Sequence, residues 1–463
     1  MTSVSYLRND TCAKGKRSRS NSDSMPLEAL RSVLASLTEW FDPQLLLTLA
    51  QQCGFTRRTS RKLTPLLFVQ ATVLLVSQST VSLRRWAALI GVLGDVCLAK
   101  QSLWERINVR AVAFLQAVLA LVLARRLQLP AAARPAALKS FHRVLVQDST
   151  TIQLAPKLAA AFPGSRNQRG ARHGQLKIQA LYDLLAQRFV SFSLSGFNRN
   201  DQAAAYDVVR GVRAGDLVLR DLGYFVIASL QQIAQAGAFF LSRLRLDTGL
   251  WDVRTGKPLN LLGQLQRHSQ FDGEVLLGAA KFPVRLVAVK LPEAVAAERR
   301  RKARANRDRR CHPTARSLAL LGWAIFVTNV PRTAWSSKTV AQVYGLRWRI
   351  ETIFKTWKSH FRMTEVPRGS AAQLEAMIYA RLIFVTLMAP LCATSPWRQG
   401  DPTAPPPLSL LKLAALVADF FLILCLEASH RRISDAWLLQ LHYHGRYEHR
   451  TRKHFMETLM KLS

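Results

Sequence analysis

Apolar residues recur with a helical period in two parts of this chain. Near the N-terminus they mark one helical face at Leu27, Leu30, Val33, Leu34, Leu37, Trp40 and Phe41. A second stripe of the same period consists of Leu346, Ile350, Ile353, Phe354, Trp357 and Phe361. Residues three and four apart lie on one face of an α-helix, because the helix turns once in about 3.6 residues. We therefore predict helices from residue 26 to about 129, and a further helix over 337–361.

Short runs of β-branched and apolar residues replace this pattern after Pro135. Runs of this kind, bounded by turn residues, are typical of β-strands. The strands that we predict lie at 142–154, 176–185, 189–195, 216–221 and 239–246. The helices that we predict between them lie at 201–212 and 224–236. This β-β-β-α-β-α-β order is the ribonuclease-H-like (retroviral-integrase-like) arrangement, so we expect an α/β fold with such a core.

Shifts in composition divide the chain into five stretches. In chain order we expect a disordered basic tail at 1–24, a helical N-terminal domain at 25–135, an α/β domain at 136–394, a Pro-rich linker at 395–407, and a last helix with a basic tail at 408–463. The first stretch is rich in Arg, Lys, Ser and Asn and has little to bury. A β-rich insertion at about 247–333 interrupts the α/β domain before the helix at 337–361.

The charge of the chain is strongly unbalanced. It has 65 Lys and Arg against 29 Asp and Glu, which gives a formal net charge of +36. Such a chain repels itself unless a polyanion neutralises it, and contacts of Lys and Arg to phosphates supply much of the affinity in nucleic-acid binding. We therefore expect DNA or RNA as the partner, with an anionic membrane as the competing polyanion.

A membrane-bound protein is not expected from the apolar stretches. Charged residues such as Arg381 interrupt the longest of them, so none is a clean span of about 20 residues. The N-terminus also lacks the apolar segment of a signal peptide. We therefore expect a soluble cytoplasmic protein that does not bind a membrane.

Two segments are open to more than one interpretation. Residues 82–110 have the pattern of a helix-turn-helix, with Gln101, Ser102 and Arg106 available to a DNA groove, or of an ordinary helical bundle. The basic run at 299–310 is either a DNA clamp or a mobile solvated loop.

Three acidic residues stand where the predicted elements bring them together. Asp148 lies in the first predicted strand and Asp221 ends the fourth, and these strands are neighbours in a ribonuclease-H-like sheet. Glu351 lies on the helix predicted across them. Carboxylates in this arrangement can hold two divalent cations about 3.5–4 Å apart, and such hard oxygen ligands suit Mg²⁺, with Mn²⁺ as a substitute. A turn or cap is the structural alternative for the two aspartates, and the competing carboxylates are Asp183, Asp201 and Asp216.

Four polar residues share one face of the helix predicted at 337–361. Arg347, Glu351 and Lys358 follow Tyr344 at offsets of three, seven and fourteen residues. The face therefore combines one carboxylate with phosphate-binding groups, since Arg and Lys supply charge and Tyr supplies a hydroxyl or a ring. A solvated helix also carries charges at such spacings, so this face alone does not define a site.

The spacing Tyr-x2-Arg-x3-Glu-x6-Lys at 344–358, with Gln-Asp-Ser-Thr at 147–150 and Arg-Asp-Leu-Gly-Tyr-Phe at 220–225, resembles the DDE transposases of the insertion-sequence-four family. The resemblance extends over roughly residues 140–390. It implies that the catalytic, metal-binding triad is Asp148, Asp221 and Glu351. It further implies that the residues gripping DNA phosphate near the transposon end are Tyr344, Arg347 and Lys358.

The resemblance implies further roles. Related transposases stack a flipped base on aromatic residues, for which Trp323 and Trp348 are candidates, and a structural aromatic is the alternative for each. The insertion at about 247–333 is similar to one that helps to hold a DNA hairpin in that family. The N-terminal helical domain becomes a candidate for binding the DNA ends.

We therefore expect an enzyme that binds double-stranded DNA at terminal inverted repeats, cuts the element ends with Mg²⁺ and joins the 3′-hydroxyls to target DNA. Pairing of two ends leads us to expect a homodimer in the DNA complex, acting at the nucleoid of a bacterial cytoplasm. Two alternatives remain. One is a DNA-binding protein with an unused transposase core, and the other is a structure-specific, metal-dependent nuclease.

Overall fold

The computed structural model describes residues 41–393, apart from 59, 61, 78–80, 125–134, 167–171, 269, 306–312 and 366–368, and the single residues 409, 412, 415 and 416. The tail predicted at 1–24, the start of the N-terminal helical segment and the linker predicted at 395–407 lie outside these residues. The same holds for most of the stretch 408–463.

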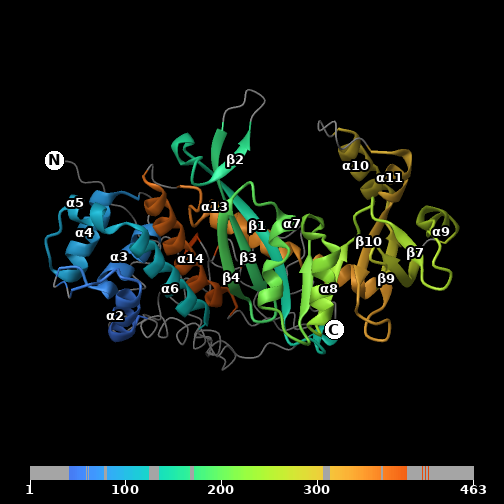
Figure 1. Cartoon of the computed structure of the whole chain (residues 1–463), viewed down its shortest axis with the longest axis horizontal. Coiled ribbons are helices and arrows are strands. Elements are labelled where there is room, and N and C mark those ends of the chain that lie inside the picture. The colour runs from blue at the N-terminus through green and yellow to red at the C-terminus, as the bar shows by residue number, and fades with distance from the viewer. Residues whose placement is uncertain are drawn as a thin grey trace, which may run out of the picture.

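One mixed β-sheet runs through the centre of the protein (Figure 1). The strands are β1 (Val144–Leu154), β2 (Pro163–Arg166), β3 (Arg172–Asp183), β4 (Arg188–Gly196), β5 (Leu217–Arg220), β6 (Phe239–Arg243), β7 (Leu250–Asp252), β8 (Gln270–Leu277), β9 (Phe282–Lys290) and β10 (Trp323–Thr328). Within the described residues the sheet order is β2-β3-β1-β5-β6-β10-β9-β8-β7, and β4 pairs with β3 beside this path. The expected mixed α/β fold is thus confirmed.

The central strands are parallel, and the flanking ones are antiparallel. β1 pairs in parallel with β5, and β5 pairs in parallel with β6. Strand β1 begins with Val144, Leu145 and Val146, which are all fully buried, as expected for a strand that is covered on both faces. The five predicted strands are confirmed, and so is the prediction that the first and fourth of them are neighbours.

The prediction of one continuous helix at 201–212 is wrong. The structure has a short helix α7 (Asp201–Ala204) and then a 3-10 helix η3 (Asp207–Arg210). The carbonyl of Ala204 accepts a hydrogen bond from Nε2 of Gln147 on β1. A side chain of the sheet thus satisfies a carbonyl that a longer helix would use, and the helix ends there.

The insertion extends the central sheet. Strands β7 to β10 continue the sheet beyond β6. The helices of this region are α9 (Leu261–Arg267), α10 (Glu293–Arg304) and α11 (Ala315–Leu320). Residues 299–304 of the basic run belong to α10, so of the two interpretations the loop does not hold for them, and the DNA clamp stays untested. The run from 306 onward lies outside the described residues.

Helices cover the sheet on both faces and at one end (Figure 1). The N-terminal helices are α2 (Pro43–Gln52), α3 (Pro65–Ser77), α4 (Leu83–Gly94), α5 (Lys100–Arg106) and α6 (Val109–Ala124). α14 (Ala371–Ala393) lies between these helices and the sheet and packs against α6, α3 and β4. One apolar core runs from α2 through α14 to β1. Gln101, Ser102 and Arg106 are exposed on α5, and a helix-turn-helix there stays a prediction.

The apolar helix α14 qualifies a prediction about membranes. By length and composition alone, Ala371–Ala389 is long and apolar enough to cross a membrane, although no such span was expected. However, 78% of this window is buried inside the protein. Core helices have the same composition, and the packing of α14 against α3 and α6 explains its apolar surface.

The helix predicted at 337–361 is divided into two. α12 (Ser337–Gly345) ends one residue before Leu346, and α13 (Trp348–Ser359) follows. At the joint the N–H of Leu346 donates to the carbonyl of Val343, three residues back. A glycine at the joint favours such a break, because Gly is a poor helix former. The prediction of one continuous helix is therefore wrong, since Tyr344 belongs to α12 and Glu351 to α13. The two residues between these helices keep helical dihedral angles, so Tyr344, Arg347 and Glu351 still meet at one site.

Candidate active site

The candidate site lies on one face of the sheet, where β1 and β5 are neighbours. Gln147 of β1 is paired with Arg220 of β5, and the residues that directly follow them are Asp148 and Asp221. Successive side chains of a strand point to opposite faces, so the two carboxylates share a face. Helix α13 packs against β1 and carries Glu351.

The three carboxylates line one cavity of about 430 Å³. The other residues that line it are Ser149, Thr150, Arg347, Phe354, Lys355, Lys358 and Ser359. Five of the eight residues predicted for the site thus meet at one cavity. Lys355 and Ser359 were not predicted. Lys355 lies four residues after Glu351 on the helix, and Ser359 directly follows Lys358.

The Arg347 guanidinium lies among the three carboxylates. Its Nη2 atom is 2.6 Å from Oε1 of Glu351 and 3.8 Å from Oδ1 of Asp221, and its Nη1 atom is 3.4 Å from Oδ2 of Asp148. The Arg347 side chain is only 6% exposed. The cation therefore offsets the mutual repulsion of the acids. The predicted partner of Arg347 was a DNA phosphate, whereas its partners within the protein are carboxylates.

Two aromatic side chains flank this arginine. The Tyr344 hydroxyl donates to Oδ1 of Asp221 at 3.4 Å. The guanidinium carbon of Arg347 lies 5.9 Å from the Tyr344 ring centre and 5.2 Å from that of Trp348. Trp348 is 60% exposed, so most of its surface is available to a ligand.

Burial changes the acidity of Asp148. Removal from water raises the pKa of this carboxyl to about 6, and the neighbouring charges of Asp221 and Glu351 add to the effect. The Ser149 N–H, which donates to Oδ1 of Asp148 at 2.8 Å, and the Arg347 cation oppose it. The net result is a pKa of about 6 for Asp148, well above the usual value of an aspartate.

The structural alternative for Asp148 and Asp221 was a role in a turn or a helix cap. Asp221 precedes the 3-10 helix η4 (Leu222–Tyr224) as its N-cap residue, but its side chain makes no capping hydrogen bond. Asp148 bonds the next backbone N–H and also faces Arg347.

Each competing carboxylate has a structural partner, and Asp201 also accepts a hydrogen bond from Oγ of Ser149, which lines the cavity. Asp183 accepts a hydrogen bond from the N–H of Leu185 at 3.0 Å, in the turn after β3. Asp201 pairs with Lys177 at 2.7 Å, and Asp216 pairs with Arg143 at 2.5 Å. None of the three carboxylates lines the 430 Å³ cavity.

Trp323 lies away from the other predicted residues. It begins β10, is half-buried and packs against an apolar core that the insertion shares with β1, β5 and β6. Its indole N–H is buried without a hydrogen-bond partner. These contacts match the alternative of a structural aromatic, and its stacking role stays a prediction.

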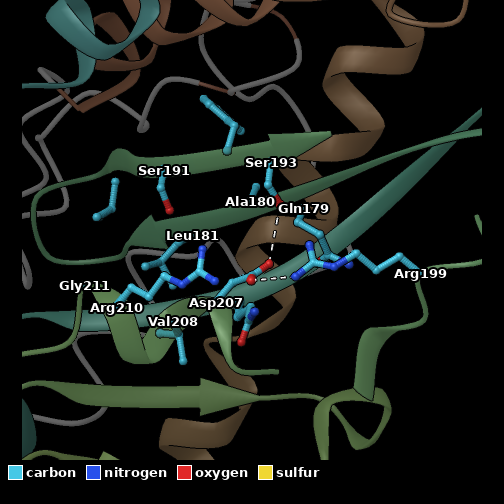
Figure 2. Close-up of a pocket in the computed structure, with 13 residues that line it drawn as sticks. Gln179, Ala180, Leu181, Ser191, Ser193, Arg199, Asp207, Val208, Arg210 and Gly211 are labelled. Carbon is cyan, nitrogen blue, oxygen red and sulfur yellow. Dashed lines mark hydrogen bonds and ion pairs between the residues drawn. The ribbon is translucent and has the colours of Figure 1, made fainter. Parts of the chain in front are cut away.

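A larger cavity of about 570 Å³ lies over β3, β4 and η3. Figure 2 shows the side chains of Arg199 and Asp207 pointing toward each other in it, at 2.6 Å, with Ser193 above them. Its one lining carboxylate is therefore already paired. The smaller cavity, which gathers three carboxylates, is the stronger candidate for catalysis.

Comparison with known proteins agrees with this geometry. A family model described as the transposase DDE domain matches residues 139–387, more than half of the chain. The chain belongs to the DDE transposase family. The match covers β1 to β10 and both α12 and α13, so all three carboxylates of this transposase lie inside the matched domain.

Similar transposases come from Bacillus thuringiensis and Clostridium perfringens. The transposase for insertion sequence element IS231D of Bacillus thuringiensis subsp. finitimus is 30% identical over 369 residues, 74% of this chain and 76% of that protein. The transposase for IS231F of Bacillus thuringiensis subsp. israelensis is 29% identical over 387 residues, 78% and 80% of the two chains. The transposase for IS1151 of Clostridium perfringens is 26% identical over 392 residues, 79% and 81% of the two chains. The expected membership of the insertion-sequence transposases is confirmed.

A DDE transposase acts on DNA and uses a divalent metal. In the part of the chain that the structure describes, no three His, Cys, Asp or Glu side chains meet closely enough to hold a metal ion as they stand. Arg347 lies between the acids instead. The donor set nevertheless fits, because three carboxylates around one open cavity supply the hard oxygens that such ions prefer.

Proposed function

We propose that this transposase cuts DNA at the ends of its insertion sequence and joins the freed 3′-hydroxyls to target DNA, with Asp148, Asp221 and Glu351 as the catalytic carboxylates. The observation that carries the proposal is the convergence of these acids on one cavity that two lysines also line. Ion pairs engage Asp201 and Asp216, and a backbone N–H binds Asp183, which supports this choice of triad.

The proposed cofactor is a pair of Mg²⁺ ions held by the triad, with Mn²⁺ as a substitute. When bound, these ions supply an activated water or 3′-hydroxyl and stabilise the leaving oxygen of the phosphodiester. The protein's own groups position the DNA. Lys358 lies at the cavity and binds phosphate, while Tyr344 and Arg347 add a hydroxyl and a second cation. Their charges offset the repulsion between the DNA backbone and the carboxylates.

The DNA substrate that we propose is double-stranded, with terminal inverted repeats bound by the N-terminal helices and target DNA bound later. The exposed ring of Trp348 offers a surface for stacking an unpaired base, as a hairpin intermediate requires. The strand order β4-β3-β1-β5-β6 supports a ribonuclease-H-like core. We further propose that a homodimer pairs the two DNA ends of the insertion sequence in the bacterial cytoplasm.

The test is DNA cleavage by purified protein on a duplex that carries the element's own end. Wild type in Mg²⁺ is expected to give nicks or hairpins at the boundary on denaturing gels, and strand-transfer products on a target plasmid. Glu351→Ala is expected to lose both while the shifted complex persists on native gels. The matched control is Glu365→Ala, because Glu365 is an exposed glutamate that pairs with Arg362 at 3.2 Å and does not line the cavity.

The outcomes separate the three candidate functions. Binding without cutting by the wild type, in Mg²⁺ and in Mn²⁺, would favour a DNA-binding protein with an unused core. Cutting without strand transfer would favour a structure-specific nuclease.

A further inference from the structure

Arg220 is a fully buried cation on the face of the sheet opposite the catalytic cavity. Its exposed fraction is 0%, and among the described residues it forms no ion pair with an acid. Arginine keeps its charge in proteins, and a buried charge without a counter-ion is expensive by several kcal/mol. An apolar residue would fill this position at lower cost. The presence of Arg220 at this position is therefore better explained by a role other than stability.

The contacts of Arg220 join three elements. Its Nη2 atom donates to Oε1 of Gln147 on β1 at 3.1 Å and to the carbonyl of Ala205. Its Nη1 atom donates to Oγ of Ser229 at 3.0 Å, on helix α8 (Ile227–Gln235). Gln147 is 3% exposed, and its Nε2 atom donates in turn to the carbonyl of Ala204 at 2.7 Å. One guanidinium thus ties β5 to β1, to α8 and to the residue after α7.

The position of this contact in the sheet matters most. The pairing of β1 with β5 runs from Val144 opposite Leu217 to Gln147 opposite Arg220 and ends there. The residue that follows each member of this last pair is a carboxylate of the triad: Asp148 follows Gln147, and Asp221 follows Arg220. Beyond this last pair no backbone pairing joins β1 to β5. The side-chain bond between Gln147 and Arg220 is therefore the last direct link before the carboxylates.

We propose that Arg220 and Gln147 are positioning residues that fix the separation of Asp148 and Asp221 for metal binding. The proposal rests on the proposed function of the triad. Partners behind metal ligands typically change metal affinity or activity by about 10- to 100-fold when removed. Arg220 touches neither substrate nor metal ligand side chains, and it acts through the strand that each aspartate follows.

The experiment compares four variants with the wild type. Arg220→Met removes the cation, and Arg220→Lys keeps the charge but has a single nitrogen that cannot reach the same three acceptors. The double variant Gln147→Leu/Arg220→Met removes both partners, so that no unsatisfied amide is left on β1. Arg381→Met is the matched control. Arg381 is another buried arginine, 1% exposed, whose Nη2 atom donates to the carbonyl of Glu365 in the loop before α14.

Two readouts are taken on full-length protein bound to end DNA. The first is Mn²⁺ binding, measured by electron paramagnetic resonance, and the second is the Mn²⁺ concentration for half-maximal cleavage. The thermal midpoint of each variant is measured in parallel. We expect both Mn²⁺ values to rise about 10- to 100-fold in Arg220→Met, Arg220→Lys and the double variant. Arg381→Met is expected to keep the wild-type values.

A double variant with wild-type Mn²⁺ binding would overturn the proposal, because only hydrogen-bond satisfaction would then have mattered. Equal shifts in Arg381→Met would also overturn it, since loss of any buried arginine would be enough. Arg220→Lys decides the question if Arg220→Met does not fold. A wild type that binds Mn²⁺ but cuts no DNA would refute the proposed function alone, and the Mn²⁺ comparison would still decide the positioning role.

Discussion

The Nη2 atom of Arg347 lies 2.6 Å from Oε1 of Glu351, one helical turn further along the chain. The same guanidinium faces Asp148 and Asp221, so a cation of the protein itself lies among the three acids. A divalent metal ion would need the same oxygens. We therefore expect Arg347 and the metal to compete for the triad.

Replacement of Arg347 by Ala tests this competition. Without metal, the three carboxylates lose their counter-ion, and we expect the free energy of unfolding to fall by about 1–3 kcal/mol. Added Mg²⁺ is expected to raise the thermal midpoint more in the variant than in the wild type, because no cation must be displaced. Arg245→Ala is the control, since Arg245 forms an exposed pair with Asp247. A smaller Mg²⁺ shift in Arg347→Ala than in the wild type would contradict the prediction.

The raised pKa of Asp148 predicts a pH effect on stability. The carboxyl has a pKa of about 6 in the folded protein and of about 3.9 in an unfolded chain. The folded state therefore holds the proton more tightly, and its contribution to stability is complete below pH about 4 and is lost as the pH rises to about 6. The loss amounts to about 2–3 kcal/mol.

Asp148→Asn checks this effect, because the amide does not titrate. We expect the metal-free wild type to lose more stability than Asp148→Asn between pH 4 and pH 6.5 in chemical denaturation. Parallel curves for the two proteins would show that Asp148 does not titrate in this range.

The two candidate tryptophans are expected to respond differently. Trp348 is exposed beside Arg347, and its replacement by Ala is expected to weaken binding of hairpin-ended DNA by about 5- to 150-fold, since stacking of one base is worth about 1–3 kcal/mol. Trp323 packs in the insertion, so Trp323→Ala is expected to lower the free energy of unfolding by about 1–3 kcal/mol instead. Equal DNA binding by wild type and Trp348→Ala would remove Trp348 from the DNA site.

Asp216 provides a test of the chosen triad. Its carboxylate pairs with Arg143 at 2.5 Å and is almost fully buried. Asp216→Ala leaves that cation without its partner, and we expect a loss of about 3 kcal/mol in stability. The Mn²⁺ concentration for half-maximal cleavage is expected to stay at the wild-type value. A shift of that concentration would return Asp216 to the list of candidate metal ligands.

The strands could be predicted because they depend on local pattern, and the neighbouring aspartates because the order of the elements is typical of a ribonuclease-H-like sheet. Runs such as Val144 to Val146 are apolar wherever the sheet is covered on both faces. The break between α12 and α13 was missed, since the apolar period continues across Gly345. A single glycine lowers helix stability by about 1 kcal/mol, and tertiary contacts decide whether the helix breaks.

Side-chain partners were the least predictable part of the site. Spacing on a helix indicated that Arg347 and Glu351 share a face, but it did not indicate that Arg347 would point inward to the acids of two strands. The partners of Arg220 are equally distant in sequence, at Gln147 and Ser229. Such contacts depend on the assembled sheet, which a single stretch of sequence does not encode.

The insertion begins after β6 and its last strand is β10, and these two strands are direct neighbours in the sheet, with Phe326 opposite Arg243. Both ends of the inserted segment are thus held side by side. Its length therefore does not enter the distance between Asp221 and Glu351. We therefore expect changes of length in the loops of this segment to be tolerated better than changes in β9, which packs against α12.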